Sequence, residues 1–119
     1  MSHLLQYLNR FSSFAGLCNH INDLKYLKIP IKYPFTIIIN TRETKNTNNY
    51  WVVLFIDNKG TGEYFDPLGG KPRDEIQAFL TIQCPNKVRY ATYCHNNLMP
   101  SILHCIGYIK EKEETTNLF

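Results

Sequence analysis

The sequence predicts an α+β domain in which a small mixed sheet is flanked by helices. Two apolar segments, 51–56 and 62–65, enclose the turn Asp57-Asn-Lys-Gly60, and this pattern is typical of a β-hairpin. Patterns of helical periodicity are segregated from this hairpin and occupy residues 2–12, 73–82 and 100–109. Such segregation favours the α+β class over a regular alternation of strands and helices.

In the first part of the chain, residues 2–12 place leucine and phenylalanine side chains at helical spacing behind Ser2, a residue type that caps helices. Residues 14–27 contain Gly, Asn and Asp and are interpreted as a loop with at most one helical turn. The run Phe-Thr-Ile-Ile-Ile at 35–39 predicts a strand that is buried on both faces. Polar residues at 41–49 then predict a loop before the hairpin.

After the hairpin, glycines and prolines in 66–72 predict a turn, and a helix over 73–82 is expected to begin just after Pro72 with acidic residues in its first turn. Alternating residues predict a further strand of the sheet at 88–93. Pro100 is a residue type that opens helices, so we expect a buried helix over 100–109. The charged remainder, 110–119, is expected to fray.

Composition limits the classes of protein. With 119 residues, 44% of them hydrophobic, the chain is expected to form one globular domain over 1–119. Its apolar runs are too short to span a bilayer, and a net charge of +3 permits no more than weak nucleic-acid contact. The sequence shows no signal-peptide pattern and no Cys-x-x-Cys pair, so the four cysteines are expected to be reduced thiols inside a cell. No metal or other cofactor is predicted.

Several segments match the pattern of one protease family. They are the end of a strand at Asn40-Thr41, the strand Trp51-Val-Val-Leu-Phe55, the strand Gly62-Glu-Tyr-Phe-Asp66 with the Pro-Leu-Gly that follows it, and the segment Cys105–Tyr108. On these residues the chain resembles the adenovirus-type maturation proteases, above all the compact forms encoded by Maverick/Polinton-like elements. That family shares its core fold with the SUMO-specific proteases. The resemblance therefore implies a papain-like, adenain-like cysteine protease fold over residues 1–119.

The resemblance also implies where the catalytic groups would stand. The family uses a cysteine nucleophile, a histidine base, an orienting carboxylate and a side-chain amide that holds the oxyanion. Here Tyr50 stands at the histidine position, directly before the tryptophan, and Asp66 stands at the carboxylate position. Asn97 falls at the position of the family's glutamine. The nucleophile position falls on Cys105 if one residue is inserted, and on His104 in the alignment without a gap.

These replacements lead to two functional hypotheses. The side chain of tyrosine has a pKa of about 10 and is a poor base at neutral pH. We therefore expect a catalytically degenerate homologue of a viral or mobile-element protease that binds a peptide or protein. The alternative is an active cysteine endopeptidase that processes viral structural precursors through Cys105, with His20 or His95 supplying the base. Either function implies a cytoplasmic or nuclear location, or association with a virion.

Each candidate also has an ordinary structural explanation. Tyr50 is then an aromatic residue at the start of a strand, and Asp66 initiates a turn or caps a helix. Cys105 is then a buried thiol on an apolar helix, and Asn97 belongs to a polar loop. The two kinds of explanation differ in one respect: only the catalytic one requires residues 50, 66, 97 and 104–105 to converge.

Overall fold

The fold is described by a computed structural model that places residues 2–11, 13–27, 33–42, 49–84, 86–91 and 100–117. Helices and strands follow one another in the order α1 (Ser2–Leu8), β1 (Phe14–Cys18), the 3-10 helix η1 (Ile21–Tyr26), β2 (Phe35–Asn40), β3 (Trp51–Ile56), β4 (Thr61–Phe65), α2 (Asp74–Gln83), β5 (Lys87–Ala91) and α3 (Ser101–Asn117). The predicted α+β class is confirmed.

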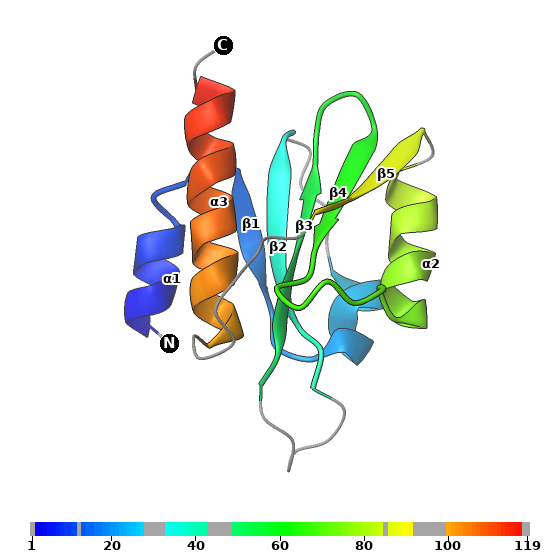
Figure 1. Cartoon of the computed structure of the whole chain (residues 1–119), viewed down its shortest axis with the longest axis horizontal. Helices are drawn as coiled ribbons and strands as arrows, with labels where there is room; N and C mark the ends of the chain where they lie inside the picture. Colours follow the sequence, from blue (N-terminus) through cyan, green and yellow to red (C-terminus); the bar gives the residue numbers. More distant parts are fainter. Residues whose placement is uncertain are drawn as a thin grey trace.

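The five strands form one mixed sheet in the order β1-β2-β3-β4-β5 (Figure 1). The three central strands pair antiparallel, whereas β1 and β5 pair parallel to their neighbours. The predicted hairpin is β3–β4, and Asp57 closes its turn by accepting hydrogen bonds from the backbone N–H groups of Lys59 and Thr61 at 2.8 and 2.9 Å. Gly60 completes this turn with a φ of 78°, a conformation that favours glycine.

Helices cover both faces of the sheet. Figure 1 shows α1 and α3 on one side of the sheet and α2 with η1 on the other. Because successive side chains of a strand point to opposite faces, Trp51 and Val53 pack with α3 while Val52 and Leu54 pack with α2 and η1. All residues of β2 are buried, as predicted for 35–39. The core is therefore two apolar layers that share the central strands.

The interpretation of 14–27 as a loop is wrong for most of that segment. Residues 14–18 form β1, which pairs with β2 in parallel, and residues 21–26 form η1. His20 caps η1, because its Nδ1 accepts a hydrogen bond from the Asn22 N–H at 3.1 Å. The strand was missed because its pairing partner lies about 20 residues away in the sequence and Gly16 weakens the local strand signal.

Two further helix boundaries differ from expectation. The first helix ends at Leu8 rather than at residue 12, and the last helix continues to Asn117 instead of fraying after 109. Lys112 explains the longer helix, since its ammonium group forms an ion pair with Glu63 of β4 at 3.1 Å. One turn earlier, the Tyr108 ring stacks on Phe65 with 4.7 Å between centroids. Tertiary contacts of these side chains thus hold the charged segment in helical form.

For the remaining elements, the predicted and observed bounds agree within one residue where the structure describes them. The helix expected over 73–82 is α2, and β5 covers the first residues of the strand expected at 88–93. Residues 92–99 lie outside the described residues. Among the helices of the described part of the chain, none combines the length and the apolar character needed to cross a membrane.

Candidate functional site

Tyr50 and Asp66 meet at the end of the β3–β4 hairpin. The Tyr50 hydroxyl donates a short hydrogen bond to Oδ1 of Asp66. The Leu68 N–H donates to both oxygens, with 2.9 Å to the Tyr50 hydroxyl and 2.9 Å to Asp66 Oδ1. The hairpin register brings these residues together, because Val53 pairs with Phe65, and Tyr50 precedes Val53 by three residues while Asp66 directly follows Phe65.

The turn that follows β4 encloses the Asp66 carboxylate. The Gly69 N–H donates to the Asp66 carbonyl at 2.9 Å, and Gly69 has a φ of 76°. A Cβ atom at Gly70 would lie 2.8 Å from Oδ2 of Asp66, so this position accepts only glycine without a shift of the carboxylate. As a result the Asp66 residue is 7% exposed, and its Oδ1 already accepts two hydrogen bonds.

The backbone of Trp51 joins this hairpin to α3. Its N–H donates to Oγ of Ser101 at 3.0 Å, and its carbonyl accepts from the Cys105 thiol at 3.2 Å. If β4 continued in register, Pro67 would face Trp51, and proline has no N–H to donate to that carbonyl. The first two turns of α3 therefore take the place of the missing strand and satisfy both backbone groups of Trp51.

Cys105 is fully buried at this junction. Its exposed fraction is 0%, and it belongs to the apolar cluster between α3 and the sheet. Burial, and secondarily the charge of Asp66, raise the pKa of the Cys105 thiol. The thiol therefore stays protonated at neutral pH. A reactive cysteine has the opposite properties, namely partial exposure and a lowered pKa.

The tyrosines of the site are also held in their neutral form. Burial, followed by the hydrogen bond to Asp66, raises the pKa of Tyr50. Burial and the charge of Asp66 raise the pKa of Tyr64, which is 3% exposed on the neighbouring strand. A neutral phenol that donates to a carboxylate cannot accept a proton from a thiol. In this arrangement Asp66 is paired with a hydrogen-bond donor and orients no imidazole through that bond.

The structure thus brings part of the predicted set together. Tyr50 and Asp66 are hydrogen-bonded to each other. Cys105 of α3 is linked to this pair indirectly, because its thiol donates a hydrogen bond to the backbone carbonyl of Trp51, the residue after Tyr50. His104, the alternative at the nucleophile position, lies on the same helix and is partly exposed. Asn97, like His95, lies outside the described residues.

His20 and Ser101 have structural roles that were not predicted from the sequence. The Nδ1 of His20 caps η1, which packs with α2 on the sheet face opposite to α3. Ser101 was not singled out in the sequence, although it follows Pro100 at the start of α3, where its Oγ accepts the Trp51 N–H. Among the residues that the structure describes, no three His, Cys, Asp or Glu side chains gather as a metal site requires.

Comparisons with known proteins show a similarity of fold. No protein-family model matches the sequence, and no curated protein sequence matches it either. Among solved structures, the crystal structure of the selenomethionine form of the ASFV pS273R protease superposes with a TM-score of 0.64 at 16% sequence identity. The matched region covers 92% of this chain and 54% of that chain, so this chain spans about half the length of that protease.

The similarity to a viral protease confirms the protease fold expected from the sequence. At 16% identity it concerns the arrangement of strands and helices alone. The narrower resemblance to adenovirus-type and Maverick/Polinton proteases stays a prediction.

Proposed function

We propose that this chain is a catalytically inactive domain with a cysteine-protease fold that acts by binding a polypeptide. The observation that carries this proposal is the Tyr50–Asp66 hydrogen bond. In the family that the sequence resembles, the first of these positions holds the histidine that takes the proton of the thiol. Here a neutral phenol stands there and donates to the carboxylate.

The state of Cys105 supports the same proposal. Its thiol is 0% exposed, has a raised pKa and donates to the Trp51 carbonyl. A peptide carbonyl has no access to this sulfur unless α3 moves. Removing a general base alone lowers a rate by about 10²–10⁴-fold, and a buried, protonated nucleophile lowers it further.

Hydrolysis and thiol labelling test this proposal. We expect the wild-type chain to cleave a mixture of fluorogenic peptides no faster than its Cys105→Ser variant. Iodoacetamide, followed by mass spectrometry, should modify Cys105 in the urea-unfolded chain and spare it in the folded chain. The buried thiols of Cys18 and Cys84 serve as references for ordinary core cysteines.

The alternative hypothesis, an active endopeptidase, predicts the opposite pattern. Cys105 would then be alkylated in the folded chain before Cys18 and Cys84, and peptide hydrolysis would disappear in Cys105→Ser. Either result would overturn the proposal. A gain of hydrolysis in Tyr50→His, with a silent wild type, would trace the inactivity to the absent imidazole.

A further inference from the structure

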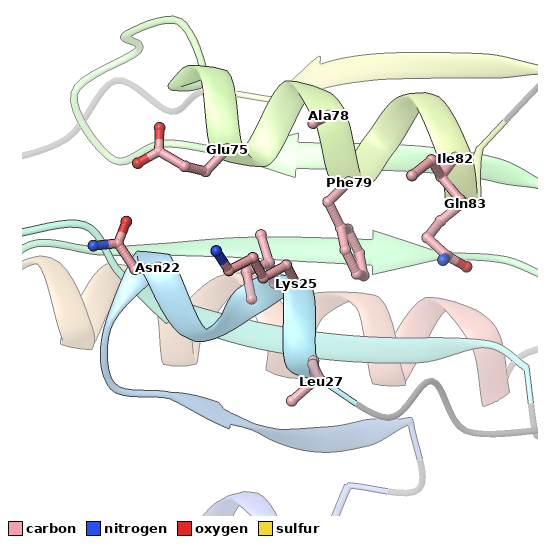
Figure 2. A pocket seen from close by; sticks show the side chains of 9 residues that line it. Asn22, Lys25, Leu27, Glu75, Ala78, Phe79, Ile82 and Gln83 are labelled. Atoms are coloured by element: carbon pink, nitrogen blue, oxygen red, sulfur yellow. The ribbon is translucent and has the colours of Figure 1, made fainter.

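A groove runs between η1 and α2 on the sheet face opposite to α3. Figure 2 shows the side chains that line it from the two helices. Its volume is about 310 Å³, which lies within the range of pockets that bind ligands. Neither Tyr50, Asp66 nor Cys105 belongs to its lining, so the groove is distinct from the candidate site.

The groove has an apolar floor and an exposed apolar wall. Leu24 and Phe79 form the buried part, with exposed fractions of 2% and 8%. Leu27 is half-buried at the end of η1, and Ile82 on the last turn of α2 is 75% exposed. Burial of such an exposed isoleucine against a partner would stabilise the complex. Because Ile82 lines the groove, a bulky apolar side chain of a partner would fit there.

One uncompensated cation lies on the groove. Glu75 of α2 forms an ion pair with Arg73 at 3.4 Å, so its charge is balanced. Lys25 of η1 forms no ion pair with any residue that the structure describes and lies 5.1 Å from the centre of the Tyr26 ring. In Figure 2 the Lys25 ammonium lies toward the Glu75 end of the groove, whereas Ile82 lies at the other end.

We infer that this groove binds a polypeptide segment that carries a bulky apolar residue next to an acidic one. The apolar side chain would enter between Phe79 and Ile82, and the carboxylate would pair with Lys25. The inference rests on the proposed function only in its choice of a polypeptide as ligand. The groove and Cys105 lie on opposite faces of the sheet, so peptide binding and catalytic activity are tested separately.

The probe for this site is the blocked hexapeptide Glu-Glu-Leu-Phe-Glu-Glu, compared with the same peptide in which lysine replaces each glutamate. Titration of the isotope-labelled full chain, followed by amide NMR signals, locates the contact. We expect the acidic peptide to shift the signals of Leu27, Phe79 and Ile82. The basic peptide should bind about five- to tenfold more weakly, because Lys25 then faces like charges.

Two variants and a matched control make the test specific. Ile82→Glu should weaken binding of the acidic peptide about tenfold, whereas Leu103→Glu, a change of an exposed leucine on α3, should leave it unchanged. Lys25→Glu should reverse the preference between the two peptides. Equal binding of both peptides would overturn the inference, as would equal effects of Ile82→Glu and Leu103→Glu, or shifts centred on Tyr50 and Asp66. Hydrolysis of a peptide through Cys105 would overturn the proposed function and leave this result standing.

Discussion

Removal of one oxygen atom, in Tyr50→Phe, tests whether the tyrosine–carboxylate contact stabilises the fold. The variant loses the hydrogen bond to Asp66, whereas the ring keeps its packing against the α2-side core cluster. Asp66 retains the Leu68 N–H as a donor at 2.9 Å. The change removes one hydrogen bond to a buried charged group, which contributes about 1.5–3 kcal/mol. It also removes the hydroxyl as an acceptor for the Leu68 N–H, which keeps Asp66 as its acceptor.

A loss of about 2 kcal/mol corresponds to about a 30-fold fall in the folding equilibrium constant and, for a chain of this length, a melting temperature lower by about 8 °C. Urea unfolding followed by far-ultraviolet circular dichroism measures the free energy of unfolding. Tyr26→Phe is the matched control, because Tyr26 is 74% exposed and its hydroxyl should contribute within about 0.5 kcal/mol. If Tyr50→Phe proves as stable as Tyr26→Phe, the contact does not hold the hairpin end.

A double-mutant cycle separates this contact from other effects of the substitution. Asp66→Ala removes both carboxylate oxygens, so each single variant abolishes the contact. If the two residues interact as described, the coupling between Tyr50→Phe and Asp66→Ala should be about 0.5–3 kcal/mol. Additive effects would contradict a direct interaction.

Two other changes follow from the packing and the raised pKa values. Gly62→Ala would place a Cβ atom 2.4 Å from Sγ of Cys84, so it should lower the free energy of unfolding by about 1–3 kcal/mol. Adding Cys84→Ala should recover part of this loss in urea titrations, and no recovery would assign the loss to another contact. The buried thiol of Cys105 and the phenols of Tyr50 and Tyr64 have raised pKa values, so the unfolded chain releases their protons first. The free energy of unfolding should therefore be insensitive to these groups below about pH 8 and fall as the pH rises above about 9. A urea midpoint that stays constant up to about pH 10.5 would contradict this.

The hairpin could be predicted because its signals are local, whereas Tyr50 and Asp66 were singled out through the family resemblance. The turn at 57–60 and the apolar segments on both sides of it indicate the pairing of β3 with β4, and the register of that pairing brings Tyr50 near Asp66. By contrast, β1 depends on parallel pairing with β2, and its five residues carry little periodic signal of their own. The helical state of 110–117 likewise depends on a tertiary contact, the ion pair between Lys112 and Glu63 of β4.

The contact between Trp51 and α3 could not be predicted from the sequence for a related reason. Ser101 and Cys105 lie 50 and 54 residues from Trp51, and nothing in their local pattern indicates which strand the helix meets. The sequence predicted that Cys105 is either a nucleophile or a core thiol. The distinction rests on which side of the helix faces the sheet, and this is decided by packing of the whole domain.

The hydrogen bonds between Trp51 and α3 also make the fluorescence of the chain sensitive to the position of that helix. Trp51 is the single tryptophan of the chain, it is 6% exposed, and its two backbone groups bond to the first two turns of α3. When the helix is docked, the indole lies in the apolar layer that also contains Cys105. When the helix lifts away, the indole meets water and its emission moves to longer wavelength. Without any added label, the intrinsic fluorescence of the chain thus reports the docking of this one helix.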